Sequence, residues 1–88
     1  MYYLYILKCR DESLYTGITT DLKRRVGEHN SKNKGAKYTA GRRPVVVVYS
    51  KKFKNRSTAS KEEARIKGLD RIDKLELIKS WQKKLKVV

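Results

Sequence analysis

The stretch Tyr2-Tyr3-Leu4-Tyr5-Ile6-Leu7, followed after a polar break by Leu14-Tyr15-Thr16-Gly17-Ile18, decides the fold. Aromatic and branched apolar residues at this density are typical of buried β-strands. The segment Arg10-Asp11-Glu12-Ser13 between the two runs supplies polar turn residues. The two runs therefore predict a β-hairpin.

A short helix is predicted directly after the hairpin. Thr19-Thr20-Asp21 offers N-cap side chains, because a hydroxyl or carboxylate accepts hydrogen bonds from the amides of a first helical turn. Four residues then recur at the spacing of one helical face: Leu22, Arg25, Val26 and His29. Two of them are apolar, as a core-facing stripe requires. Arg25 and His29 are unusual on such a face.

A third strand is predicted after a polar segment. Residues 30–43 contain Gly35, Gly41 and many Lys and Arg residues, and we interpret them as a basic loop. The run Val45-Val46-Val47-Val48-Tyr49 is apolar on both faces, so we expect this strand to be central or well covered.

Two helices are predicted to complete the chain. Residues 57–60 precede the first, Ser60 with Glu63 fits a capping box, and Gly68 is its expected end. Asp70 is expected to cap the last helix. That helix carries an apolar stripe at Ile72, Leu75, Leu77, Ile78, Trp81 and Leu85.

The elements combine into one α/β (α+β) domain of 88 residues. Their order is β-β-α-β-α-α, and we expect a three-stranded, mainly antiparallel sheet flanked by helices. The domain is expected to span residues 1–88, with a motif-bearing core at about 2–69 and a C-terminal helix at about 70–85.

The charge of the chain indicates an anionic partner. Twenty-three Lys and Arg residues against nine Asp and Glu residues leave a net charge of +14. Repulsion among these positive charges destabilises the compact chain unless an anionic partner neutralises them. Nucleic acid is such a partner, and its binding is favoured because neutralised phosphates release condensed counterions. A highly soluble surface, or attachment to a ribosome or a membrane, is the alternative explanation.

The basic residues of the predicted loop are candidates for nucleic-acid contacts. Phosphate contacts of this kind position a nucleic acid without reading its sequence, so we expect sequence-independent or structure-selective binding. The candidates in the loop are Lys32, Lys34, Lys37, Arg42 and Arg43; Lys51, Lys52, Lys54 and Arg56 follow the third strand, and Tyr38 is a candidate for base stacking.

Cys9 is the single cysteine, so an intrachain disulfide and a Cys-rich metal site are excluded. The apolar run 2–7 is too short for the core of a signal peptide, and no run reaches transmembrane length. We therefore expect a cytoplasmic monomer without a membrane partner or a small-molecule cofactor.

Several of these residues form a pattern that resembles the GIY-YIG nuclease family. The pattern comprises Tyr3-Leu4-Tyr5, Tyr15-Thr16-Gly17, then Arg25 and His29 on one helix, and finally Glu63. It departs from the family's letters at Tyr3, where the family often has Gly, and at the substituted middle position of the second triplet. The chain looks most like the small stand-alone members of UPF0213 type.

The resemblance implies a metal-dependent endonuclease that hydrolyses phosphodiester bonds in DNA or in structured nucleic acid, with DNA favoured over RNA. It implies catalytic roles for Tyr5, Tyr15, Arg25, His29 and Glu63. It also implies that Glu63 holds a divalent metal, Mg²⁺ or Mn²⁺, with the adjacent Glu62 as the alternative ligand. A single carboxylate is chemically reasonable, because Mg²⁺ keeps most of its waters and often takes substrate oxygens.

The residues themselves leave alternatives open. Arg25 needs a partner near the sheet, which is either a phosphate or a carboxylate such as Glu63. His29 can bind a phosphate, assist a tyrosine in proton transfer or cap its helix. Tyr5 and Tyr15 are equally placed to take a proton from water.

Two other functions fit the same residues. A non-catalytic basic protein that binds nucleic acid would keep the same fold and surface. An interaction module for acidic proteins or the ribosome would instead use the apolar stripe of the last helix.

Overall fold

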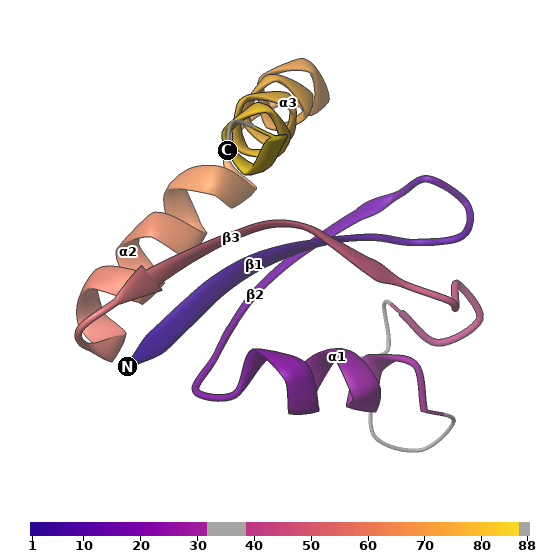
Figure 1. The fold of residues 1–88 in the computed structure, drawn as a ribbon, viewed down its shortest axis with the longest axis horizontal. Coiled ribbons are helices and arrows are strands. Elements are labelled where there is room, and N and C mark those ends of the chain that lie inside the picture. The colour runs from indigo at the N-terminus through magenta and orange to yellow at the C-terminus, as the bar shows by residue number, and fades with distance from the viewer. Residues whose placement is uncertain (32–38, 87–88) are drawn as a thin grey trace.

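The chain folds into a three-stranded antiparallel sheet with helices on both faces (Figure 1). The structure is a computed structural model and describes residues 1–31 and 39–86. The elements are β1 (Tyr2–Lys8), β2 (Leu14–Thr19), α1 (Leu22–His29), β3 (Val46–Phe53), α2 (Arg56–Lys67) and α3 (Arg71–Lys86). The predicted order and the α/β architecture are confirmed. Within the described ranges, no helix is both long enough and apolar enough to span a bilayer.

The strand β1 occupies the centre of the sheet, in the order β2-β1-β3. Because side chains alternate along a strand, its residues enter two separate cores. Leu4 and Ile6 pack with α2 and α3, in a cluster that includes Ile66 and Ile78. Tyr5 and Leu7 face the opposite side, where α1 contributes Leu22 and Val26. Figure 1 shows α1 on one side of the sheet and the other two helices on the opposite side.

Of the two positions expected for the valine run, central or well covered, the central one is wrong, whereas Val45, Val48 and Tyr49 are buried. The strand begins at Val46, continues to Phe53 and forms an edge of the sheet. Val45 is buried just before the strand, because Asn30 Oδ1 accepts from its N–H at 2.7 Å and Asn30 Nδ2 donates to its carbonyl at 3.2 Å. Val46 is 56% exposed. β1 takes the centre because its side chains have apolar partners in both cores.

The start of α2 also differs from the prediction. The helix begins at Arg56, and Asn55 caps it by accepting a hydrogen bond from Thr58 N–H at 3.0 Å. The expected capping box of Ser60 and Glu63 is therefore wrong, since both residues lie inside the helix. Gly68 ends the helix as predicted.

The other helix starts agree with the sequence. Asp21 caps α1 by accepting from Arg24 N–H at 3.0 Å, and Asp70 accepts from Asp73 N–H at 2.9 Å at the start of α3.

The apolar stripe of α3 is only partly a core face. Ile72 is 72% exposed and Leu75 is 44% exposed, whereas Leu77, Ile78 and Trp81 pack in the core on this side of the sheet.

Candidate active site

A buried hydrogen bond joins β1 to α1. Tyr5 lies in the middle of the central strand, and its hydroxyl is 3.0 Å from Nε2 of His29, the last residue of α1. The other ring nitrogen, Nδ1, is 3.0 Å from Oγ1 of Thr39. All three residues are buried. The imidazole is thus held at both nitrogens by hydroxyl groups, which fixes its orientation.

Tyr15 and Gly17 of β2 complete this cluster. Tyr15 is half-buried, and its ring centroid lies 5.1 Å from that of His29 and 6.4 Å from that of Tyr5. Gly17 pairs directly with Tyr5 across the two strands. A Cβ atom on Gly17 would lie 2.6 Å from the Tyr5 hydroxyl oxygen, so the missing side chain makes room for the phenol.

Arg25 is held by a carboxylate of its own helix. Its Nη1 donates to Glu28 Oε1 at 2.8 Å, and its side chain is 28% exposed. The alternative partner suggested by the sequence, Glu63, does not form this ion pair; the i,i+3 spacing within α1 brings Glu28 closer. Whether Arg25 also binds a phosphate stays a prediction.

The environment keeps the proton on Tyr5 and off His29. Burial, with the phenol of Tyr15 and the charge of Glu63 adding to it, raises the pKa of Tyr5 to about 12, against the opposing effect of the Arg25 guanidinium. Burial is also the main reason that the pKa of His29 is lowered from 6.5, and the charge of Arg25 lowers it further. His29 is therefore neutral at pH 7.

The lowered pKa of His29 makes folding stability depend on pH. Between the ordinary value near 6.5 and the lower value in the folded state, the unfolded chain binds more protons, so the free energy of unfolding falls as the pH drops below about 6.5. We expect urea unfolding from about pH 7.5 to about pH 5, above the range where carboxylates titrate, to show this loss. His29→Gln should remove the slope in this window. An equal slope in both proteins would assign it to another group.

Glu63 belongs to α2, which lies on the opposite side of the sheet from α1. Its carboxylate is 3.3 Å from Lys67 Nζ and is 22% exposed, and its charge contributes to the pKa of Tyr5. Both oxygens of the neighbouring Glu62 accept from Arg65 at 2.7 Å. In the part of the chain that the structure describes, there is no group of three or more His, Cys, Asp or Glu residues suited to a metal. Whether Glu63 holds a divalent ion stays a prediction.

Two of the five basic loop candidates can be located. Arg42 donates to Asp11 Oδ2 at 3.0 Å and so connects the loop to the hairpin turn, while Arg43 is partly exposed. Lys32, Lys34 and Lys37, together with Tyr38, lie outside the described residues. Their assignment to a nucleic-acid surface stays a prediction.

Sequence reasoning missed two members of the site and the packing role of a third, Gly17. Glu28 could have been found, because it follows Arg25 by three residues within a predicted helix. Thr39 gave no periodic signal, since it lies in a loop and reaches His29 through the tertiary fold. The packing role of Gly17 required the strand register, which places it opposite Tyr5.

Residues 1–76 match the GIY-YIG catalytic domain. The chain belongs to the GIY-YIG family. Its relatives include a UPF0213 protein of Oceanobacillus iheyensis, 57% identical over 88% of this chain and 88% of that protein, and one of Desulfotalea psychrophila, 50% identical over 93% and 74%. The GIY-YIG fold is also similar to the solution NMR structure of a UPF0213 protein from Bacillus halodurans. That structure has a TM-score of 0.58 and 45% identity, over 90% of this chain and 84% of the other.

A second similar structure is the solution NMR structure of a protein from E. faecalis. Its TM-score is 0.63 and its identity 47%, over 92% of this chain and 85% of the other. The resemblance to small UPF0213 members of the GIY-YIG family is thus confirmed. Membership in the GIY-YIG family indicates a nuclease-type function and a nucleic-acid substrate, and GIY-YIG nucleases generally use divalent metals.

Proposed function

We propose that this GIY-YIG protein is a metal-dependent endonuclease that hydrolyses phosphodiester bonds in DNA or in structured nucleic acid. The observation that carries the proposal is the hydrogen bond between the Tyr5 hydroxyl and a buried, neutral His29, with Arg25 beside it. A phenol held against a neutral imidazole can accept a proton on one side and release its own on the other. Such a pair suits the activation of water.

The proton moves in a relay. Tyr5 Oη takes a proton from the attacking water while its own proton passes to His29 Nε2, which is 3.0 Å away. The neutral imidazole that accepts this proton at Nε2 carries its own hydrogen on Nδ1, and that N–H donates to Thr39 Oγ1. The hydroxide attacks phosphorus, the bond to the leaving oxygen breaks, and that oxygen takes a proton from solvent. His29, now an imidazolium, returns its extra proton through Tyr5 to solvent, as its lowered pKa favours. The relay avoids a free phenolate, which the pKa of about 12 disfavours at neutral pH.

Arg25 neutralises the charge that develops on the phosphoryl oxygens. Its planar guanidinium can donate two parallel hydrogen bonds to a phosphate, and Glu28 orients it by accepting from Nη1. Arg25 is more than a quarter exposed, so a phosphate can approach it from solvent. Donors positioned before the reaction stabilise a transition state without reorganising.

Glu63 is the residue that would hold a divalent ion, Mg²⁺ or Mn²⁺. When bound, such an ion supplies Lewis-acid stabilisation of the phosphate and the leaving oxygen. Neutralising the Glu63 carboxylate also removes one of the charges that raise the pKa of Tyr5, which makes the phenol a better participant in the relay. Glu62 is the weaker candidate because both of its oxygens are engaged by Arg65.

The basic loop, including Arg42 and Arg43, would contact the phosphates beside this site. We propose DNA as the preferred substrate, recognised without base sequence, and a cytoplasmic monomer as the working form, because a charge of +14 on each chain opposes self-association. Affinity for nucleic acid should fall steeply as salt increases.

A cleavage assay with purified protein and Mg²⁺ or Mn²⁺ tests the function. We expect cleavage that a chelator stops, that Glu63→Ala abolishes and that Arg25→Ala lowers by about 10²–10³ in kcat, the usual cost of one transition-state donor. Arg24→Ala is the matched control, because Arg24 lies on the same helix but is 60% exposed and 4.0 Å from Glu28. Its kcat should stay within a few-fold of wild type.

The substrates should include branched, flapped and single-stranded DNA and RNA. Equal cleavage by wild type, Arg25→Ala and Glu63→Ala would mean that the activity does not come from this site. Tight, salt-sensitive binding without cleavage of any substrate would instead identify a non-catalytic nucleic-acid-binding protein.

A further inference from the structure

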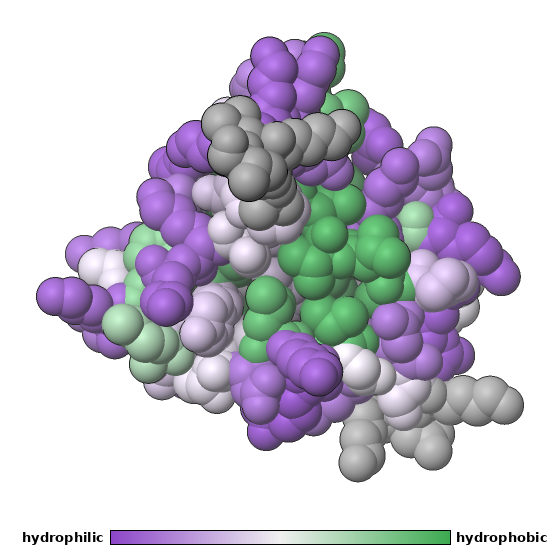
Figure 2. Space-filling model, in the orientation of Figure 1, coloured by the Kyte–Doolittle hydropathy of each residue, from purple (hydrophilic) through white to green (hydrophobic). Residues whose placement is uncertain are grey.

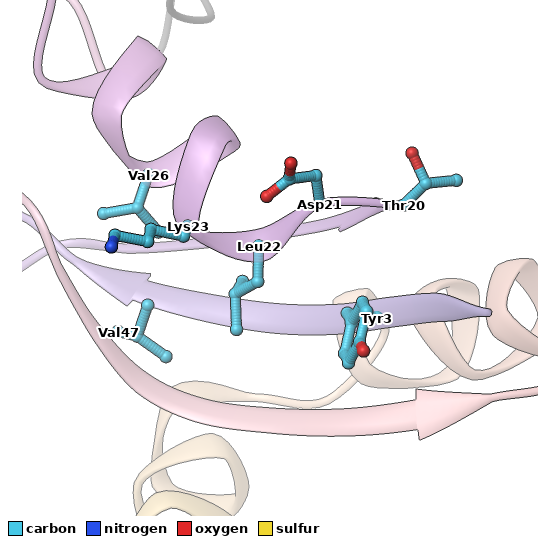
Figure 3. A pocket seen from close by; sticks show the side chains of 7 residues that line it. All are labelled: Tyr3, Thr20, Asp21, Leu22, Lys23, Val26 and Val47. Atoms are coloured by element: carbon cyan, nitrogen blue, oxygen red, sulfur yellow. The ribbon is translucent and has the colours of Figure 1, made fainter.

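An apolar groove lies between α1 and β3, over the start of β1 (Figure 3). Its volume is about 600 Å³. The side chains of Tyr3, Leu22, Val26 and Val47 give it an apolar lining, and Lys23 stands at its wall. Figure 2 shows hydrophobic side chains gathered over β3 and toward α1 on this side of the molecule. A hollow of this size and polarity suits a flat, apolar group.

The groove adjoins the candidate active site. Tyr3 and Tyr5 lie two residues apart on β1, so their side chains leave the same face of the sheet, about 7 Å apart along the strand. Leu22 and Val26 of the groove share α1 with Arg25 and His29 of the site. A ligand in the groove would therefore lie next to a phosphate held at Arg25.

Positive charge flanks the groove at two points. Lys23 belongs to its lining. Lys52 is exposed and pairs directly with Tyr3 in the register of β1 and β3, which places both side chains on the same face. The one acidic residue at the rim, Asp21, is engaged in capping α1. An aromatic ring and apolar walls between two ammonium groups match a nucleobase flanked by its own phosphates.

We propose that this groove binds one unstacked nucleobase of the nucleic acid, adjacent to the phosphate that is cleaved. The substrate class is accordingly nucleic acid with an unpaired nucleotide at the cleavage position. The inference rests on the proposed nucleic-acid function. Phosphates complement the charge of +14, whereas a second copy of the chain would add to the repulsion.

The test compares three duplexes by fluorescence anisotropy, with a chelator present so that cleavage does not interfere. One duplex is fully paired, one carries a single unpaired nucleotide, and one carries an unpaired abasic nucleotide, which keeps the bend and the charge but lacks the base. The wild-type protein should bind the unpaired base about 10-fold more tightly than the abasic site, as expected for one base stacked on an aromatic side chain.

Two matched variants locate the effect. Val47→Arg fills the groove and adds a positive charge, so it should erase the 10-fold preference while the affinity for the fully paired duplex is kept. Val46→Arg adds the same charge at the neighbouring residue, which is exposed and outside the groove lining, and should keep the preference. Tyr3→Ala removes the stacking surface instead of filling the groove, so it covers the case in which Val47→Arg fails to fold.

The outcomes separate this inference from the proposed function. If no duplex binds, the nucleic-acid function itself is wrong. Equal affinity of the wild-type protein for the base and the abasic site would overturn the groove assignment alone. A Val47→Arg variant that turns a dimer into a monomer, with the base preference unchanged, would identify a self-association surface and also overturn it.

Discussion

Replacing Tyr5 with Phe is expected to lower kcat by about 10²–10⁴, the usual contribution of a positioned proton-transfer group. The substitution removes one oxygen atom and leaves the ring in its buried position between Gly17 and His29. It breaks the hydrogen bond to His29 Nε2 and with it the proposed path of the proton. Substrate affinity should change little, because the substitution removes no charge and leaves Arg25, the group proposed to hold the phosphate, in place. Single-turnover cleavage kinetics and a separate binding titration measure the two effects.

Tyr15→Phe is the matched control for this experiment. It removes the same atom from a ring that lies 5.1 Å from the imidazole, measured between centroids, but Tyr15 is half-buried and is not the partner of His29 Nε2. We expect a smaller loss of kcat than for Tyr5→Phe. The opposite order would move the proton acceptor to Tyr15 and contradict the relay.

Gly17→Ala is expected to lower the free energy of unfolding by about 1–3 kcal/mol, the usual cost of overpacking a well-filled site. The new Cβ would lie 2.6 Å from the Tyr5 hydroxyl oxygen and 2.8 Å from Cζ. Tyr5 is 1% exposed, so its ring can move only by displacing the side chains packed around it. The phenol should therefore shift away from His29, and cleavage should fall together with stability. Urea unfolding and cleavage rates of the same protein check both effects.

Gly27→Ala serves as the control, because it is expected to raise the free energy of unfolding instead of lowering it. Gly27 is exposed inside α1, and a Cβ there meets nothing within 4 Å. Alanine should raise the free energy of unfolding by about 0.5–1 kcal/mol, because glycine loses more backbone entropy in a helix. Destabilisation by both substitutions to the same extent would argue against a specific collision at Gly17.

The hairpin and the helix caps could be predicted because they depend on neighbours in the sequence. Dense runs of aromatic and branched apolar residues define β1 and β2, and the carboxylates of Asp21 and Asp70 accept from amides three residues later. The start of α2 was missed because Asn55 competes with Ser60 as a cap, and only its hydrogen bond to Thr58 N–H decides between them.

The order of the strands could not be obtained in the same way. A run of valines fits an edge strand covered by loops and helices as well as it fits a central strand. Two hydrogen bonds from the Asn30 side chain to the backbone of Val45, fifteen residues away, hold the residue that precedes the strand. Such a contact has no signature in local periodicity.

The sequence by itself determined the element order, the positive charge and the family pattern of two tyrosines, Arg25, His29 and a helical glutamate. Each of these follows from composition or from spacing along the chain. The tertiary structure alone decided that Tyr5 forms a hydrogen bond with His29 and that Glu28 forms an ion pair with Arg25. It also decided that the phenol of Tyr5 lies where a side chain at position 17 would be. The hydrogen bond and the contact between Gly17 and Tyr5 depend on the strand register and on the packing of α1 against β1. The ion pair depends on the orientation of the Arg25 side chain. Spacing along the chain specifies none of these.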